Sequence, residues 1–315
     1  MSTHEIDIVK AGKEASERIA KLTPKQIKNI NKFVDRMLVI EGEEAIKRGD
    51  LGYLARALVM ATMPHSKPKS NEFERKNGNY TLSMIAPSKM GLPYGVYPRL
   101  LMAWINTEAV KTKSRHLILG QSLSGFMAKL DLVPTGGRWG TITRLKSQIN
   151  KLFSTSIYAS YDTENQTKIK NFNIISEADL WWEPKEPDQI MLFESSVVLG
   201  EAFYKEIINN PVPIDIEALK ALKSSALALD IYMWLTYRMH NLKSIQHISW
   251  ETLMLQFGSD YKEVKHFKAE FKKQLKKVQL IYSDVKIDAS GRKTLLLKPS
   301  PTHIKKLNKE LTKQC

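Results

Sequence analysis

The chain has 315 residues, of which 43% are hydrophobic and 26% charged, and this composition excludes the fibrous, disordered and disulfide-scaffold classes. Its 48 Lys and Arg against 33 Asp and Glu give a formal net charge of +15. Residues 261–315 hold 15 basic and 5 acidic residues, so +10 of the excess lies there, and this concentration indicates a polyanionic partner.

Nucleic acid is the favoured partner, because the sequence shows no lipidation motif and no apolar run of the roughly 20 residues that a membrane span needs. A lysine-rich tail that only keeps the protein soluble is the alternative. Acidic residues stand where a signal peptide would have lysines, and the one cysteine, Cys315, has no internal partner for a disulfide. We therefore expect no export signal, no membrane contact and a cytoplasmic location.

Residues 1–70 are predicted to form a helical N-terminal region with a linker at its end. Helical patterns extend over residues 5–63, where Thr23-Pro24 supplies a cap and a first-turn proline. A break at Gly49-Asp50 precedes the last predicted helix, over residues 51–63, and the polar, proline-bearing stretch after it predicts the linker.

Residues 71–211 are predicted to form a first domain that opens with a β-hairpin over residues 72–85. Asn77-Gly78 supplies the positive φ angles that a tight turn needs, and strand-like residues flank it. A helix, a short strand, two further helices and a hairpin follow in that order, and Ser122 caps the second helix. Their predicted positions are residues 97–111, 115–119, 123–130, 138–153 and 156–175.

Residues 212–315, after the boundary marked by Pro211 and Pro213, are predicted to form a second domain with the same element order and a basic C-terminal tail. Ser225 and Ser249 cap the first two helices, and Asp260 with Glu263 forms a capping box for the third. The predicted positions are residues 225–240, 245–248, 249–257, 261–280 and 281–297.

Helix, strand, helix, helix and hairpin is the order of a winged helix. The predicted fold is therefore α+β, with two tandem winged-helix domains preceded by a helical N-terminal segment. At one constant offset in numbering, Trp104 aligns with Trp234 and Lys113-Ser114 with Lys243-Ser244, which indicates an internal repeat. The apolar spacing that all core helices share is the alternative explanation. The other aligned pairs are Leu101 with Ile231, Ile105 with Leu235, Ile118 with Ile248, Leu123 with Leu253 and Met127 with Phe257.

The helix over residues 261–280 has one apolar and one basic face. The apolar residues recur at spacings of three and four: Val264, Phe267, Phe271, Leu275 and Val278. A lysine stripe with its neighbours lies on another face: Lys265, Lys268, Lys272 and Lys276, joined by Lys262, Lys273 and Lys277. Because Arg292 and Lys293 follow in the hairpin, we expect this helix to bind DNA phosphates, a solvated surface helix being the alternative.

The helix over residues 138–153 is better suited to recognising bases, because arginine and glutamine make bidentate contacts with base edges. Its predicted DNA-binding residues are Arg138, Thr141, Arg144, Lys146, Ser147, Gln148 and Lys151. Thr135-Gly136-Gly137, just before it, could bring backbone amides to a phosphate. It lacks the lysine and spacing of a nucleotide-binding P-loop, so we interpret it as an ordinary loop.

Enzyme signatures are scarce in the sequence. The seven histidines form no His-x-His pair, no HExxH motif and no cysteine-assisted zinc set, and no carboxylates are paired for catalysis. The acid-rich residues 181–188 are predicted to be a solvated loop. We therefore expect no catalytic residue, no metal and no cofactor.

Several short segments resemble the plasmid-encoded RepA-type replication initiators. They lie at residues 91–95 (Gly-Leu-Pro-Tyr-Gly), 98–101 (Pro-Arg-Leu-Leu), 107–110 (Thr-Glu-Ala-Val), 113–115 (Lys-Ser-Arg), 119–120 (Leu-Gly), 122–124 (Ser-Leu-Ser), 134–140 (Pro-Thr-Gly-Gly-Arg-Trp-Gly) and 144–145 (Arg-Leu). The resemblance covers about residues 70–300, and the run through residues 136–140 is its most specific part.

This resemblance implies a two-winged-helix initiator that binds repeated sites (iterons) in double-stranded DNA at a plasmid origin. It also implies opening of the nearby duplex, recruitment of host proteins such as the host initiator and the replicative helicase, and a role in copy control. Repression of its own gene and an equilibrium between homodimer and monomer belong to the same expectation. A winged-helix repressor on a palindromic operator is the alternative, and a rolling-circle DNA nickase is a less favoured one.

Overall fold

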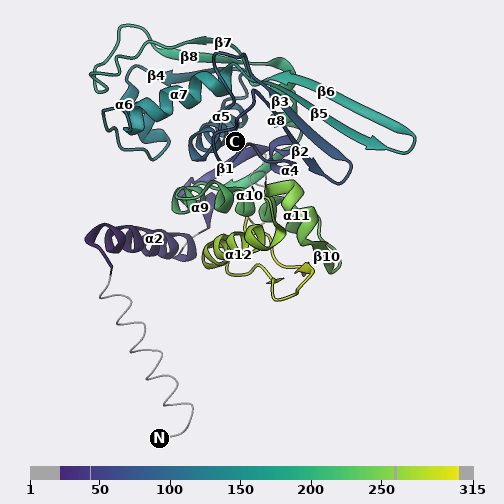
Figure 1. Cartoon of the computed structure of the whole chain (residues 1–315). Helices are drawn as coiled ribbons and strands as arrows, with labels where there is room; N and C mark the ends of the chain where they lie inside the picture. The colour runs from purple at the N-terminus through teal and green to yellow at the C-terminus, as the bar shows by residue number, and fades with distance from the viewer. Residues whose placement is uncertain (1–21, 43, 259–260, 305–315) are drawn as a thin grey trace, which may run out of the picture.

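The computed structural model describes residues 22–42, 44–258 and 261–304. Figure 1 shows two packed units, the upper one built around two β-sheets and the lower one mainly helical. Helices and strands are both abundant, which confirms the predicted α+β class. Within the described ranges, no helix has the length and apolar character required to cross a membrane.

Helix α2 (Pro24–Gly42) begins at the predicted cap. The Thr23 hydroxyl accepts a hydrogen bond from the Gln26 N–H (3.3 Å), and the Gln26 side chain accepts one from the Thr23 N–H (2.8 Å), so the two residues form a capping box. Helix α3 (Ala45–Arg48) ends at Gly49, whose φ of 76° suits a glycine. The predicted helical pattern over residues 5–21 lies outside the described residues.

The helix predicted over residues 51–63 is wrong in its first half. Leu51–Ala55 form strand β1, which pairs antiparallel with β9 (Pro211–Asp215), and only α4 (Arg56–Met60) is helical. Because β9 belongs to a distant part of the chain, the local apolar pattern carried no trace of the pairing. This two-stranded sheet joins the N-terminal region to the boundary between the two predicted domains.

The upper unit contains the predicted β-hairpin, β2 (Glu72–Asn77) and β3 (Tyr80–Ile85), with Gly78 at a φ of 57°. Helix α5 (Val96–Thr112), β4 (His116–Gly120), α6 (Leu123–Lys129), α7 (Thr141–Phe153), β5 (Ser156–Thr163) and β6 (Gln166–Asn173) then follow in the predicted order. The Ser122 hydroxyl accepts from the Gly125 N–H, as its predicted cap role requires. Helix α7 begins later than predicted, at Thr141, so Arg138 lies in the preceding loop.

Two sheets cover the upper unit. Hairpin β5–β6 pairs with β3 in a four-stranded sheet of order β2-β3-β5-β6, whereas β4 pairs with β8 (Ser195–Leu199), which also pairs with β7 (Ile175–Asp179). Strands β7 and β8 and helix α8 (Glu201–Asn209) were not predicted. Figure 1 shows β5 and β6 as long strands that project away from the helices.

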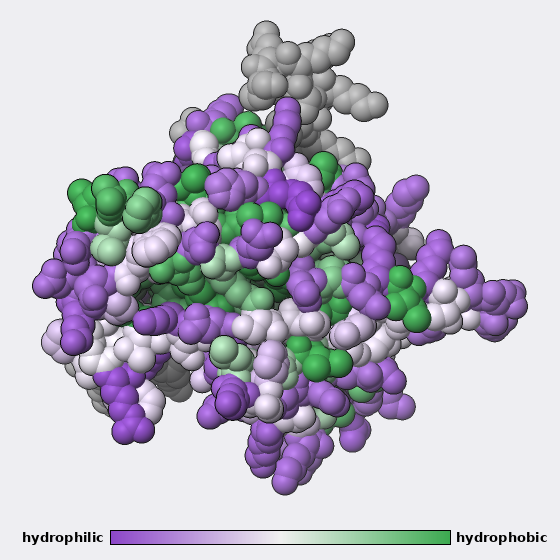
Figure 2. All heavy atoms as spheres, turned by 90° about the horizontal axis from the view of Figure 1, so that it is seen from above, coloured by the Kyte–Doolittle hydropathy of each residue, from purple (hydrophilic) through white to green (hydrophobic). Residues whose placement is uncertain are grey.

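The connection between β7 and β8 contains the acid-rich segment predicted to be a solvated loop. Several of its apolar side chains are exposed, among them Trp181, Ile190, Leu192 and Phe193. Figure 2 shows hydrophobic surface gathered at the left edge, the side on which this connection lies in Figure 1. Trp182 is partly buried: its ring stacks on Phe126 of α6, with centroids 5.1 Å apart, and anchors the loop to the core.

The lower unit follows the predicted order with one sheet. The predicted elements are α10 (Ala226–Asn241), β10 (Gln246–Ser249), α11 (Trp250–Phe257), α12 (Val264–Ile281), β11 (Ile287–Asp288) and β12 (Thr294–Leu297). Helix α9 (Ile216–Leu222), which precedes them, was not predicted. The strand order β10-β12-β11 places the strand after α10 beside the second strand of the hairpin. Ser225 and Ser249 cap α10 and α11 as predicted.

The capping box predicted for α12 is wrong. The helix begins at Val264 with Glu263 as its N-cap residue, so Glu263 does not occupy the N3 position that a capping box needs. Asp260 lies outside the described residues. The following strand is also shorter than predicted, because Ile281 is the last residue of α12.

The predicted repeat holds over its first two elements and then slips. The starts of α5 and α10 keep the predicted offset, as do those of β4 and β10, but α11 and α12 both begin earlier than this offset from α6 and α7 requires. The connections between helices therefore differ in length between the two units. Leu123 is the first residue of α6 whereas Leu253 is the fourth of α11, so these two residues are not equivalent in position.

Candidate nucleic-acid interface

Helix α7 buries an apolar face and turns a polar face outward. Ile142, Leu145, Ile149 and Leu152 are all buried in the upper core. Arg144, Lys146 and Ser147 are exposed on the outer side. This surface can reach a nucleic acid without rearrangement of the core.

Two of the predicted DNA-contact residues of α7 form side-chain hydrogen bonds with other parts of the protein. A base contact by Gln148 requires an exposed side chain, but Gln148 is only 5% exposed, and its side-chain oxygen accepts a hydrogen bond from the backbone N–H of Tyr94 (2.8 Å). Four residues correspond to a rotation of about 40° around a helix, so Gln148 lies at the edge of the face that Leu152 buries. The hydroxyl of Thr141 donates to the Val133 carbonyl (2.6 Å) and accepts from the Thr135 N–H (2.9 Å).

Residues at the two ends of α7 place positive charge over aromatic rings. The Lys151 ammonium lies 4.7 Å from the centroid of the Tyr94 ring, and the Arg138 guanidinium lies 5.2 Å from that of Trp139, which is 73% exposed. Partial burial, together with the positive charge of Lys67, lowers the pKa of Lys151. An exposed arginine beside an exposed indole suits contact with phosphates or unstacked bases.

Helix α12 has the two faces that the sequence predicts. Its buried side packs among aromatic rings of the lower core, where the Phe271 centroid lies 5.8 Å from that of Trp250 and 5.6 Å from that of Phe257. The exposed basic side chains at and around the predicted stripe are Lys262, Lys265, Lys273 and Lys276. Of these, Lys273 pairs with Glu270 (3.3 Å).

Lys268, in the middle of the stripe, ties α12 to the hairpin. Its ammonium donates to the carbonyls of Gly291 (2.9 Å) and Arg292 (2.8 Å) and lies 5.0 Å from the centroid of Trp250. Lys272 lies 5.8 Å from the same ring. Partial burial and the charges of Lys272 and Arg292 lower the pKa of Lys268.

The hairpin residues Arg292 and Lys293 are exposed next to this contact. Lys268 therefore positions the turn, and α12 and the turn present one basic surface. The structure brings together the predicted residues of α12 and the hairpin, while those of α7 form a separate surface on the upper unit.

A buried ion pair fixes the two units relative to each other. Arg99 of α5 binds Asp230 of α10 through two bonds, Nε to Oδ1 (2.7 Å) and Nη2 to Oδ2 (2.6 Å), and both side chains are about 2% exposed. His65 Nε2 lies 2.6 Å from the same Oδ2. Arg99 also donates to the carbonyls of Met63 and Pro64.

The protonation states in this cluster follow from burial and charge. Burial disfavours the ionised form of Asp230, but Arg99 and the bond from His65 outweigh it and lower the pKa of Asp230. Burial is also the largest influence on His65, and together with the charges of Arg99 and Arg75 it lowers the pKa of His65 despite the carboxylate. His65 is thus neutral near pH 7 and donates its Nε2 hydrogen to Asp230.

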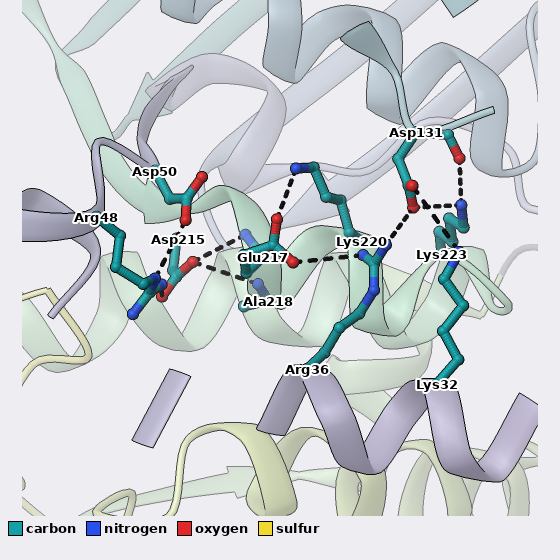
Figure 3. A network of polar contacts seen from close by, with 10 residues as sticks. All are labelled: Lys32, Arg36, Arg48, Asp50, Asp131, Asp215, Glu217, Ala218, Lys220 and Lys223. Carbon is teal, nitrogen blue, oxygen red and sulfur yellow. Dashed lines mark hydrogen bonds and ion pairs between the residues drawn. The ribbon is translucent and has the colours of Figure 1, made fainter. Parts of the chain in front are cut away.

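A second polar network, drawn in Figure 3, holds helix α2 against both units. The carboxylate of Asp131, just after α6, forms an ion pair with Arg36 of α2 (2.6 Å). It forms another with Lys223, which lies in the connection between α9 and α10. Arg36 also reaches Glu217 of α9 (3.7 Å). At its other end the network links Arg48 to Asp215 (2.6 Å), the N-cap residue of α9. Helix α2 therefore braces the junction.

The sequence interpretation missed the junction residues Arg99, Asp230 and His65. One signal was available, because Asp230 interrupts the apolar stretch 226–235 and a carboxylate in a buried helix needs a partner. Its partner, Arg99, belongs to a helix of the other unit, which no local pattern reveals. Among the described residues, no group of three or more His, Cys, Asp or Glu side chains is arranged to hold a metal ion.

Comparison with known proteins identifies related sequences and folds. A family model described as "Plasmid encoded RepA protein" matches residues 92–252, slightly more than half of the 315 residues. No curated protein matches the chain.

Two solved structures have a similar fold. A crystal structure of the RctB domains 2-3 is 13% identical with a TM-score of 0.50, and the match covers 77% of this chain and 96% of that one. A selenomethionine derivative of domain 2 and domain 3 of RctB is 11% identical with a TM-score of 0.50, covering 75% and 94%. At this identity the likeness concerns the fold alone.

Proposed function

Because the chain belongs to the family of plasmid-encoded RepA proteins, we propose that it is a replication initiator that binds repeated sites in double-stranded origin DNA through two winged helices. The observation that carries the proposal is the basic surface formed by α12 and the β11–β12 hairpin. Helices that enter a groove of DNA need one face packed on their domain and one free face of positive charge. Helix α12 has both.

The lower unit supports the winged-helix assignment through its strand pairing. The strand after its first helix, β10, pairs with the second strand of the hairpin, and α12 is the helix directly before the hairpin. In this arrangement α12 is the recognition helix and the turn with Arg292 and Lys293 is the wing. Lys268 holds the wing at a fixed distance from the helix.

The upper unit is proposed as a winged helix with an extended sheet. Helix α7 corresponds in position to α12. Hairpin β5–β6 extends the β2–β3 sheet, so β4 pairs with β8 where β10 of the lower unit pairs with the hairpin strand β12. Its exposed Arg144 and Ser147 can contact base edges, whereas Gln148 stays buried. We assign sequence recognition mainly to α7 and affinity mainly to α12.

Opening of the origin, recruitment of the host initiator and the replicative helicase, copy control and a dimer in equilibrium with the monomer are further parts of the proposed function. Membership of the family supports these parts, and the proposal includes no catalytic step in this chain. A repressor on a single palindromic operator would use the same two surfaces.

A footprint on the DNA that flanks the gene tests the proposal. Protection of tandem direct repeats beside an AT-rich tract is the expected result for an initiator. Protection of one inverted repeat alone would show a repressor. Nicked product would show an enzyme and would contradict the proposal, as would binding that does not distinguish this DNA from a scrambled duplex.

A further inference from the structure

The segment before the loop at residues 66–70 is fixed from both units. The Thr62 hydroxyl donates to the Gln256 carbonyl (3.2 Å), and the Gln256 side chain donates to the Met60 carbonyl (3.1 Å). On the other side, Arg99 holds the carbonyls of Met63 and Pro64. The sequence predicts a linker here, but the chain crosses the junction between the units in a defined path.

The loop that follows forms one wall of a cleft of about 840 Å³. Strand β2 and the C-terminal end of α11 form the other walls, with Met254, Leu255 and Tyr261 among the lining residues. Lys67 and Lys69 are exposed on the loop, and Lys76 is exposed on β2. The cleft is thus an open, basic-lined surface at the junction.

One end of the cleft continues into the surface of α7. The Gly95 N–H donates to the Pro64 carbonyl (3.1 Å), and the neighbouring Tyr94 carries Lys151 over its ring. Lys67 is near enough to Lys151 to lower its pKa by repulsion. The positive charge of α7 therefore extends along the loop.

The other end of the cleft continues toward α12. Tyr261 lines the cleft, and its ring packs on Phe267 of α12 with centroids 5.7 Å apart. Lys262 follows Tyr261, and Lys265 lies on the first turn of the helix. The loop with Lys67 and Lys69 consequently lies between the two proposed recognition helices.

The charges of the cleft favour a polyanion over an acidic peptide of matching shape. Its exposed charged lining consists of three lysines, Lys67, Lys69 and Lys76, against two acidic residues, Glu72 and Glu74. Glu74 already pairs with Lys76 (3.4 Å). A peptide would be bound by the cleft alone, whereas a duplex can touch the cleft and both helices at once, because its phosphates repeat along the whole length.

We propose that the loop at residues 66–70 and its cleft bind the phosphate backbone of the duplex between the segments contacted by α7 and α12, with Lys67 and Lys69 as the phosphate contacts. This inference rests on the proposed function. Two recognition helices that enter successive major grooves leave one minor groove between them, and its phosphates would face the junction. The loop would then set the register of the two contacts.

The test uses the full chain with Lys67→Gln and Lys69→Gln together, and a cognate duplex taken from the footprinted repeat. We expect weaker binding, a salt slope flatter by roughly 1.8 because each lost phosphate contact removes about 0.9, and lost hydroxyl-radical protection between the two protected segments. The matched control, Lys185→Gln with Lys205→Gln, removes the same charge from the β7–β8 connection and α8 and should leave slope and footprint unchanged.

A second variant guards against loss of folding. Glu72→Gln removes an exposed carboxylate that would repel phosphates, so it should tighten binding by about two- to fivefold, a gain that misfolding cannot produce.

Lys265→Gln with Lys276→Gln, measured in parallel, separates this inference from the proposed function. If that variant weakens binding while the loop variant and Glu72→Gln behave as wild type, the inference is wrong and the proposed function stands. If neither the loop nor α12 variant changes binding, both are wrong.

Discussion

Arg99 of α5 and Asp230 of α10 form a bidentate ion pair that is almost fully buried between the two units. These helices are the first helices of the two predicted winged helices. The ion pair therefore fixes the upper unit relative to the lower unit. Its neighbours, His65 and the carbonyls of residues 63 and 64, add further hydrogen bonds to the two side chains. This polar cluster, together with the network around Asp131, fixes the relative placement of the proposed DNA-binding surfaces.

Breaking this pair is expected to destabilise the protein strongly. Asp230→Ala leaves the Arg99 guanidinium buried without its carboxylate, which costs about 3–5 kcal/mol in comparable cases. Replacing both, Arg99→Met with Asp230→Leu, should cost much less because no charge is left buried. Urea unfolding measures the difference. Equal losses of stability in the single and double variants would show that the unpaired buried charge is not the cause of the destabilisation.

Stability is expected to fall as the pH is lowered from 7 to 5. Burial lowers the pKa of His65 in the folded protein below its ordinary value of 6.5, so the unfolded chain takes up the proton first. The contribution of neutral His65 to the free energy of unfolding is therefore present above pH 6.5. It is lost as the pH falls toward the pKa of His65 in the folded protein. His303, whose pKa burial also lowers, acts in the same direction.

His65→Gln should reduce the slope of unfolding free energy against pH in this range without abolishing it, by at most about 1.4 kcal/mol per pH unit. The measurement is urea unfolding at half-unit pH steps. A variant with the wild-type slope would mean that His65 binds its proton equally well in both states.

On α7, Arg144→Ala is expected to reduce discrimination between cognate and scrambled DNA, since a good bidentate base contact contributes about 1–3 kcal/mol. Gln148→Ala should act differently, because its side chain accepts the Tyr94 N–H and is buried. Gln148→Ala should lower thermal stability more than it changes discrimination between the two duplexes. Competition binding with both duplexes checks this, and a wild-type specificity ratio for Arg144→Ala would remove α7 from base recognition.

On α12, two lysines of one stripe should respond differently. Lys276→Gln loses one exposed charge and should flatten the salt slope by roughly 0.9 with no change in melting temperature. Lys268→Gln also loses its bonds to the Gly291 and Arg292 carbonyls, so it should weaken DNA binding and lower the melting temperature as well. Identical melting temperatures for the two variants would contradict the structural role of Lys268.

Local signals in the sequence predicted much of the fold. Caps at Ser122, Ser225 and Ser249 are set by hydrogen bonds to nearby backbone N–H groups, and the Asn77-Gly78 turn needs only its own backbone angles. The errors arise where distant segments decide. Residues 51–55 form a strand because β9 offers a pairing edge. Strand β8 likewise forms beside the distant β4, and β7 forms beside β8.

In the candidate interface, too, the residues set by local spacing were predictable and those set by distant contacts were not. The lysine face of α12 follows from spacing alone, so its exposed members were predicted. Gln148 lies at the edge of an apolar face, where burial depends on whether a neighbour such as Tyr94 covers it. Lys67 and Lys69 lie in a segment whose composition indicates only a linker, and their position between α7 and α12 depends on the three-dimensional arrangement.

The central claim is that one chain binds one non-palindromic site with both units, which enter successive major grooves about 10 to 10.5 base pairs apart. Native mass spectrometry of the protein on a single minimal site, combined with a footprint of the same complex, tests this claim most directly. One chain per site with two protected grooves on one side of the duplex is the predicted result. Two chains bound symmetrically across a palindrome, each protecting a single groove, would contradict it.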